Sequence, residues 1–327
     1  MKWLYSLLAF TAVQVVSSAP SELVKRASVN DVANIGYAAQ AGTTGGSGGT
    51  STTVTTLAAL TAAVAGTAKK VVIVSGTISG NTIVKVGSNT SIIGKQGSAL
   101  VGVGLRVLNE NNVIIRNLKV SKVLADAGDA IGIQASSKVW LDHLDLSSDM
   151  DHDKDYYDGL LDITHGCTGV TVSGSKLYNH WKGSLVGHSD SNAAEDTKIT
   201  VTYANNYWSN INSRTPSFRF GKGHIYNNVF DNTGDGINTR VGAQLLVENN
   251  VWSEFLIPRR DGIMIGAKKP LYSTDGGFAV ARGNDFGGAA NTAPAGTFTQ
   301  APYSYTLIAT SSVRSAVVSS SGQTLGF

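Results

Sequence analysis

Disulfide bonds within the chain are excluded, because Cys167 is the only cysteine among its 327 residues. The fold must therefore be held together by packing and hydrogen bonds alone. Small exported modules seldom achieve this without cross-links, whereas a large hydrophobic core can. Apolar residues make up 42% of the chain, which is enough for such a core. The lack of cysteine thus favours a large, well-packed domain.

Long apolar runs are also scarce. The main one, residues 3–16, follows Lys2 and precedes small residues at 17–19. It is too short to span a bilayer, and its flanks are those of a secretory signal peptide. We therefore predict a signal peptide over residues 1–19, a secreted protein and no membrane partner. The net charge of +3 says little about other partners, and we expect no nucleic acid.

The segment after the predicted signal peptide contains the dibasic pair Lys25-Arg26. This pair either ends a propeptide over residues 20–26 or is an ordinary surface pair. In both cases we expect one catalytic domain over residues 27–327. Asn89 begins the chain's N-x-S/T sequon and is the predicted glycosylation site.

Two kinds of hydrolytic centre find no support in the sequence. The six histidines and one cysteine do not show the ligand spacing of a zinc site. No Ser/His/Asp triad is visible either, because the histidines lack a plausible nucleophile partner.

What the chain does contain is a repeat. Short β-type runs follow one another from Lys70 onward. Three of them share a pair of asparagines followed by an apolar or aromatic pair, and the second asparagines lie 22 residues apart, at Asn206, Asn228 and Asn250. Looser matches fall 22 to 34 residues from their neighbours, at Asn117, His143, Ser175 and Asn284. This period predicts an all-β fold, a right-handed parallel β-helix with one short strand set per coil.

The asparagines have a physical role in such a solenoid. Stacked at the same turn of successive coils, each amide can donate to the next and tolerate the left-handed bend. Residues 56–65 have helical composition, with Thr56 at the start and Gly66 after the end, and could cap the open end of the solenoid. The Gly/Thr/Ser-rich residues 41–53 are either a flexible or cleft-side loop or a plain linker.

Charged residues recur at about one coil's spacing where the coils are longest. Asp129, Asp158, Lys182 and Arg214 are separated by 29, 24 and 32 residues. Residues one coil apart stack about 4.8 Å apart along a β-helix. The spacing therefore allows one column of acids and bases, with Asp162 and Arg219 a few residues further along two of the coils.

Three neighbouring carboxylates repel one another and call for a cation. Calcium prefers several oxygen ligands, commonly carboxylates and water, so Asp129, Asp158 and Asp162 suit Ca²⁺. A partly hydrated calcium can also accept a carboxylate from a bound sugar acid.

These residues lie in motifs that resemble those of the pectate lyases, a family of parallel β-helix polysaccharide lyases. Five segments match in order, namely Gly128-Asp129-Ala-Ile, Val139-Trp140-Leu141-Asp142-His143, Asp158-Gly-Leu-Leu-Asp162-Ile, His180-Trp-Lys182-Gly-Ser-Leu and Arg214-Thr-Pro216-Ser-Phe-Arg219-Phe-Gly221. Each alone is a weak signal, but five in the right order over residues 110–250 are specific. The ends of the chain show no motif of this kind.

The resemblance implies a role for each matching residue. Arg214 would be the base that removes the C5 proton of a galacturonate, while Lys182 and Arg219 would bind the sugar carboxylate. The three aspartates would hold calcium, and polygalacturonate would be the substrate of a monomeric enzyme. Trp140, Asp142 and His143 would support the fold away from the cleft. Trp181 and Ser217 depart from the residues common in relatives, which leaves the fine substrate preference open.

The implied chemistry is a β-elimination. Removal of the C5 proton places a second negative charge beside a carboxylate, which calcium and cationic side chains can stabilise. Arginine is an unusual base because a guanidinium is normally protonated, so activity should rise toward alkaline pH. Three alternatives remain, namely a β-helix glycoside hydrolase, a pectin lyase for methylated substrate and a non-catalytic wall-binding β-helix.

Overall fold

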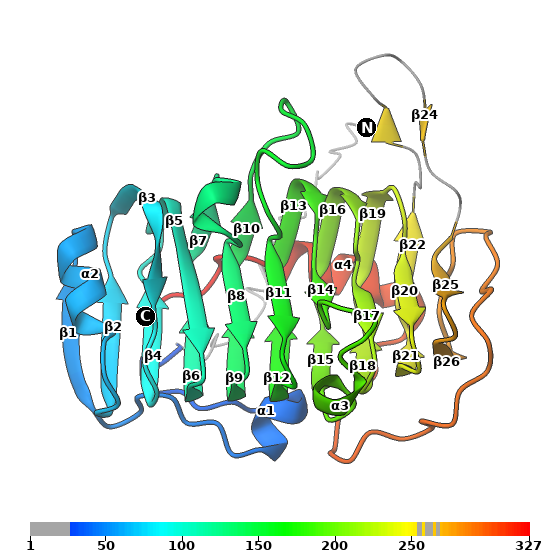
Figure 1. Cartoon of the computed structure of the whole chain (residues 1–327), viewed down its shortest axis with the longest axis horizontal. Helices are drawn as coiled ribbons and strands as arrows, with labels where there is room; N and C mark the ends of the chain where they lie inside the picture. Colours follow the sequence, from blue (N-terminus) through cyan, green and yellow to red (C-terminus); the bar gives the residue numbers. More distant parts are fainter. Residues whose placement is uncertain (1–26, 254–256, 259–263, 266–268) are drawn as a thin grey trace, which may run out of the picture.

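The computed structural model describes residues 27–253, 257–258, 264–265 and 269–327. The predicted signal peptide and propeptide lie outside this part of the chain. Within it, stacked coils of short parallel strands form a β-helix, as the 22-residue period predicted (Figure 1). No helix in the described residues is both long and apolar enough to cross a membrane.

Each coil passes through three sheets in a constant order. The first sheet contains ten parallel strands: β1 (Thr50–Val54), β2 (Lys70–Val74), β4 (Thr90–Gly94), β6 (Asn111–Arg116), β9 (Ser137–Asp142), β12 (Thr168–Ser173), β15 (Thr200–Ala204), β18 (Lys222–Tyr226), β21 (Gln244–Glu248) and β26 (Phe278–Arg282).

The second and third sheets are joined through the long strand β5 (Ala99–Leu108), which also pairs with β3 (Thr77–Lys85). The second sheet holds β7 (Lys119–Ser121), β10 (Asp145–Ser147), β13 (Lys176–Lys182), β16 (Tyr207–Ser213), β19 (Val229–Thr233) and β22 (Val251–Ser253). The third holds β8 (Ile131–Gln134), β11 (Leu161–Thr164), β14 (Leu185–Val186), β17 (Ser217–Arg219), β20 (Ile237–Arg240) and β25 (Leu271–Thr274). A separate hairpin pairs β23 (Ile257–Pro258) with β24 (Met264–Ile265).

The core lies inside the coils, where inward side chains of paired strands form continuous columns. One column of the first sheet contains only residues that are at most 1% exposed: Val72, Ile92, Ile115, Leu141, Val172, Tyr203, Ile225 and Val247. Because each coil buries its apolar face only against its neighbours, the stack is stable without disulfide bonds, and Cys167 is free and buried.

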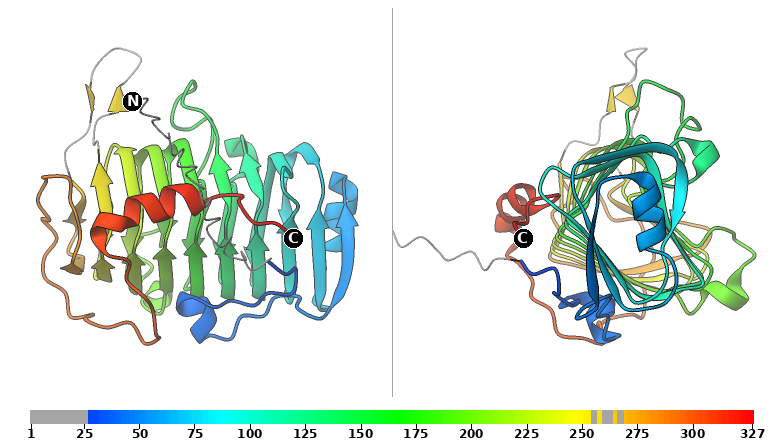
Figure 2. Two further views of the ribbon diagram at one scale, coloured as in Figure 1. Left: turned by 180° about the vertical axis from the view of Figure 1, so that it is seen from behind. Right: turned by 90° about the vertical axis from the view of Figure 1, so that its left-hand side faces the viewer.

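Helices cover the open end and the flanks of the solenoid. Helix α2 (Leu57–Ala63) lies across the first coils, with Leu60 fully buried and the Thr56 side chain accepting a hydrogen bond from the Ala59 N–H (Figure 2). This confirms the predicted capping helix and its threonine start. Helix α4 (Thr310–Ser320) packs on β19 and β22, and α1 (Gly36–Gln40), which precedes the first strand, packs on β9, β12 and β15. Helix α3 (Ala193–Asp196) and the short η1 (Ala125–Ala127) lie on connections between strands.

The Gly-rich segment 41–53 is a loop only in part, because residues 41–49 form turns and residues 50–53 form a strand. Residues 50–53 belong to β1 and pair with β2, so they are neither loop nor linker. Gly46 leaves room for a neighbouring backbone, since a Cβ there would lie 1.7 Å from the Lys70 carbonyl oxygen. Thr and Ser suit an edge strand, which explains why a polar composition was misleading here.

The predicted asparagine ladder is present between the first and second sheets. Asn206 Nδ2 donates to Asn228 Oδ1 at 3.0 Å, Asn228 to Asn250 at 2.9 Å, and Asn250 to Asn284 at 3.0 Å. The left-handed bend, however, belongs to the residue before each of the repeated asparagines, Asn205, Asn227 and Asn249.

Two of the looser matches were therefore placed one position too early. Asn117 and His143 occupy the left-handed position, with φ of 55° and 52°. The following Leu118 and Leu144 take the ladder position, and the Leu144 N–H donates to Ser175 Oγ. A bend residue and a ladder residue are adjacent in sequence, so spacing alone could not separate them.

Replacing Asn228 with alanine should destabilise the fold by about 1–3 kcal/mol, because its buried partners would lose their hydrogen bonds. Asn228 Oδ1 accepts from the Asn206 backbone and side chain, and its Nδ2 also donates to the Tyr203 and Tyr226 carbonyls. Urea unfolding measures the change, with the exposed Asn291→Ala as control. An unchanged unfolding free energy would contradict a structural role for the ladder.

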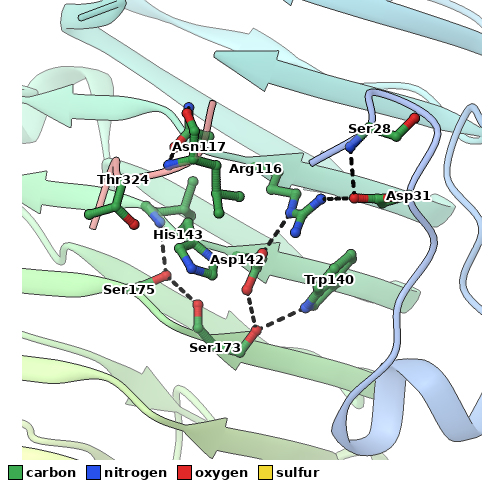
Figure 3. Close-up of polar contacts among 12 residues, drawn as sticks. Ser28, Asp31, Arg116, Asn117, Trp140, Asp142, His143, Ser173, Ser175 and Thr324 are labelled. Carbon is green, nitrogen blue, oxygen red and sulfur yellow. Dashed lines mark hydrogen bonds and ion pairs between the residues drawn. The ribbon is translucent and has the colours of Figure 1, made fainter. Parts of the chain in front are cut away.

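The V-W-L-D-H segment, which covers the end of β9 and His143, supports the first sheet through a network of polar contacts (Figure 3). Trp140 is 1% exposed and donates to Ser173 Oγ. The buried Asp142 carboxylate receives Arg116 Nε and Ser173 Oγ, each at 2.6 Å, and contacts His143 Nδ1 at 2.8 Å. Burial opposes ionisation of Asp142, but His143, Arg116 and Ser173 together outweigh it and lower its pKa.

Candidate active site

The charged residues singled out in the sequence gather where the second sheet gives way to the third. Asp129 and Asp158 end the loops that precede β8 and β11, while Lys182 ends β13 and Arg214 lies between β16 and β17. These four positions occupy the same corner of successive coils, at the passages from β7 to β8, β10 to β11, β13 to β14 and β16 to β17. This is the arrangement that the coil spacing allowed.

The contacts at this corner link neighbouring coils. Asp129 Oδ1 accepts a hydrogen bond from the Gly159 N–H at 3.1 Å, and Asp162 Oδ1 accepts one from the Leu185 N–H at 2.9 Å. The Arg214 guanidinium reaches Asp162, with Nη1 4.0 Å from Oδ2. Each buried carboxylate thus accepts, with one oxygen, a backbone hydrogen bond from the next coil.

Two glycines make this close packing possible. A Cβ on Gly159 would lie 2.5 Å from Asp162 Oδ1, so any larger residue would displace the carboxylate. A Cβ on Gly183 would lie 2.6 Å from the Arg214 carbonyl oxygen. Both glycines immediately follow a charged residue of the corner, Asp158 or Lys182. Gly159 leaves room for the Asp162 carboxylate of its own coil, and Gly183 allows the backbone of the next coil to approach.

The cationic side chains nearby do not fully compensate the negative charge of the buried carboxylates. Burial, together with the charge of Asp158, raises the pKa of Asp129 to about 6. Burial and the charge of Asp129 raise the pKa of Asp162 well above its usual range, although Arg214 acts in the opposite direction. Such carboxylates favour a bound cation, because a cation removes the repulsion that holds their protons.

Asp158 has a different partner in this structure. Its Oδ1 lies 3.1 Å from Lys182 Nζ, and Asp155 Oδ1 lies 3.5 Å from the same nitrogen. Among the described residues, no three His, Cys, Asp or Glu side chains are already arranged to hold a metal ion. The side chains of Asp129 and Asp162 fit calcium by donor type and charge, and Asp158, 44% exposed, is the ligand that would have to turn away from Lys182.

Arg214 is held in an unusual backbone conformation. Its φ is +62°, a region that L-residues rarely adopt, and its carbonyl accepts from the Ser184 N–H at 2.7 Å. The side chain remains 33% exposed. Backbone strain of this kind persists where the surrounding structure enforces it, and it aims the guanidinium at the carboxylate cluster.

Arg219 is not brought into this cluster. It lies at the far end of β17, where its Nε pairs with Asp190 and its Nη1 donates to the Gly187 carbonyl at 3.0 Å. Arg240, on the next coil, reaches the same Asp190. Five of the six predicted site residues therefore converge, and Arg219 faces a separate group of charges.

Sequence reasoning missed two residues of the corner. Asp155 shares Lys182 with Asp158, and its only signal was the run of alternating aspartates that begins at Asp149. His180 is 1% exposed, and its Nε2 contacts the Asp158 carbonyl oxygen at 2.5 Å. Burial lowers the pKa of His180 to about 4, so it is neutral near pH 7 and positions the Asp158 backbone.

Asn89, the predicted glycosylation site, lies at the turn before β4. Its Nδ2 donates to the Thr67 carbonyl at 3.0 Å, and its Oδ1 accepts from Asn112 at 2.8 Å. The amide is thus engaged on both sides, and a glycan on Nδ2 would replace the first of these bonds.

Solved structures with this architecture were found by comparison. A pectate lyase from a Bacillus species, in complex with trigalacturonate, matches with a TM-score of 0.77 and 32% identity, covering 89% of this chain and 98% of that one. Pectate lyase II from Xanthomonas campestris matches with a TM-score of 0.73 and 26% identity, over 89% and 98% of the two chains. The fold is that of the parallel β-helix polysaccharide lyases.

Sequence comparison narrows this class to one family. The pectate lyase family model matches residues 5–325. Pectate lyase A of Aspergillus niger is 57% identical over 332 residues, covering 100% of this chain and 99% of its own length. Pectate lyase A of Emericella nidulans is 58% identical over 311 residues, covering 94% and 91%. The chain belongs to the pectate lyase family.

Proposed function

We propose that this enzyme is a secreted, calcium-dependent pectate lyase that cleaves de-esterified polygalacturonate by β-elimination. The observation that carries the proposal is the convergence of Asp129, Asp158, Asp162, Lys182 and Arg214 at one corner of the coils. Residues 27–327 form its single catalytic domain, released by removal of residues 1–19 and of a propeptide ending at Lys25-Arg26. The enzyme acts as a monomer.

Calcium, when bound by Asp129, Asp158 and Asp162, supplies positive charge to the substrate carboxylate and to the enolate-like charge beside C5. Asp129 and Asp162 would supply two of the ligand carboxylates from adjacent coils, and Asp158 would complete the set after turning away from Lys182. A methylated, neutral substrate would not need this charge, so the cluster favours the free acid.

Lys182 also binds the carboxylate of the sugar that reacts. Its ammonium is 13% exposed and pairs with Asp158 and Asp155. When Asp158 turns toward calcium, Lys182 Nζ is freed to donate to an oxygen of the sugar carboxylate. Arg219 acts further along the chain of sugars, beside Asp190 and Arg240.

Arg214 removes the proton from C5 of the galacturonate. The electron pair of the C5–H bond forms a C4–C5 double bond, and the C4–O bond breaks. The leaving oxygen departs with the other half of the chain and takes up a proton from water. The products are one oligogalacturonate with a new reducing end and another with a 4,5-unsaturated sugar at its end. No water is added across the cleaved bond.

We expect incubation with polygalacturonate and calcium to produce a rising ultraviolet absorbance from the unsaturated product. A hydrolase would release reducing ends from the same substrate without that absorbance. Highly methylated pectin serves as the comparison substrate and should be cleaved more slowly. Reducing ends that appear without ultraviolet absorbance would overturn the proposed reaction.

A further inference from the structure

A pocket next to the charged corner has no role in the proposed reaction so far. Residues of β3, β5 and η1 line it, and its volume is about 410 Å³. Figure 1 shows these three elements toward the N-terminal end of the solenoid. Lys85, Arg106 and Asp126 line the pocket together with Asn81 and Thr82. Two cations thus face one carboxylate, and the rest of the polar lining consists of amide and hydroxyl groups.

The strand register places this pocket in line with the active corner. Lys85 pairs with Arg106, Arg106 with Gly132, and Gly132 with Asp162. At about 4.8 Å per coil, Arg106 lies roughly 10 Å from Asp162 along the solenoid axis. A linear chain bound across the coils at the corner would continue directly over Lys85 and Arg106.

Arg106 lies along β8, close to the loop that carries Asp129. A Cβ on Gly128 would be 2.8 Å from its Nη2, and a Cβ on Gly132 would be 3.7 Å from its Nε. These two glycines leave space for the guanidinium. The positive charge of Arg106 acts on Asp129 and favours the ionised form of that carboxylate.

The guanidinium nonetheless has no direct partner. Its Nε is buried and makes no hydrogen bond, and no carboxylate of the described residues lies within ion-pair distance of it. A buried donor without an acceptor is costly, and native structures retain one where a ligand or water completes it. The planar fork of arginine matches a carboxylate better than any other anion of similar size except phosphate.

We propose that Arg106, assisted by Lys85, forms an additional subsite that binds a carboxylate of the uronate chain beyond the sugar that reacts. This inference rests on the proposed function and extends it by one binding position. Asp126 is exposed at the edge of the pocket, so its repulsion is screened by solvent, whereas the Arg106 Nε is buried. The subsite favours long, de-esterified substrates over short ones.

Kinetics on oligogalacturonates of defined length test the subsite. For the wild type, kcat/KM should be clearly higher for hexamer and longer chains than for trimer. Arg106→Gln should raise KM for the long chains by roughly tenfold, the loss of one charge-assisted hydrogen bond. Measured at saturating calcium, so that the lost charge beside Asp129 does not limit metal binding, kcat should stay nearly unchanged. The trimer should be cleaved at close to the wild-type rate. Lys119→Gln, on β7 of the second sheet, removes the same charge elsewhere and serves as control.

Two further variants keep the test decisive if Arg106→Gln folds poorly. Lys85→Gln alters an exposed side chain and should raise KM about two- to threefold for long chains alone. Arg106→Lys should restore part of the length dependence. An unchanged length profile in the Arg106 and Lys85 variants, or an equal loss on trimer and hexamer, would overturn the subsite. A wild type that forms no unsaturated product at all would instead overturn the proposed function.

Discussion

Arg214→Lys should abolish turnover while substrate affinity holds. A general base contributes about 10²–10⁴-fold to a rate, so we expect a fall in kcat of that size. Lysine keeps the charge, but its ammonium is a compact point on a flexible stem and cannot reproduce the reach or shape of the guanidine. Arg214 is also held at φ +62° with its side chain toward Asp162, so its position is specific.

The matched control is Arg282→Lys, at the end of β26, where the arginine is half exposed and 3.7 Å from Glu248. This variant should keep wild-type kcat and KM. Initial rates from product absorbance, with KM measured alongside, separate loss of chemistry from loss of binding. If Arg214→Lys retains near-wild-type kcat, the base is another group, although the fold and the metal site would survive that result.

Removal of calcium by a chelator should eliminate activity, and added calcium should restore it. The reason is the pair of buried carboxylates, Asp129 and Asp162. Burial raises both pKa values, and the charge of Asp158 adds to the shift at Asp129 as the charge of Asp129 does at Asp162. Without a cation they repel the substrate carboxylate as well as one another. Undiminished cleavage in the presence of chelator would contradict a role for the metal.

Asp162→Asn tests the same site without removing the metal from solution. The amide can still accept from the Leu185 N–H, so the fold should persist, while the lost charge should weaken calcium binding by roughly tenfold or more. Calorimetric titration of calcium reports this directly. Asp285→Asn, an exposed aspartate on a C-terminal coil, is the control and should leave calcium affinity unchanged.

Lys182 and Arg219 were expected to act alike, and the structure separates them. Lys182 lies at the corner with Asp158, whereas Arg219 pairs with Asp190 at the opposite end of β17. Both roles were assigned from family motifs. Such a motif identifies a residue but does not show at which end of a strand its side chain makes contacts. The difference depends on a side chain from another coil, Asp190, that no motif includes.

The sequence by itself determined the parallel β-helix, the ladder of Asn206, Asn228 and Asn250, and the corner at which the charged residues meet. It could do so because a solenoid repeats one local unit, and the period alone stacks equivalent positions. Only the tertiary structure decided that Asp158 pairs with Lys182 and that Arg219 turns to Asp190. It also decided that the buried Arg106 Nε finds no hydrogen-bond acceptor within the described part of the chain. These contacts join side chains from different coils whose loops differ in length, so their geometry exists only once the coils have packed.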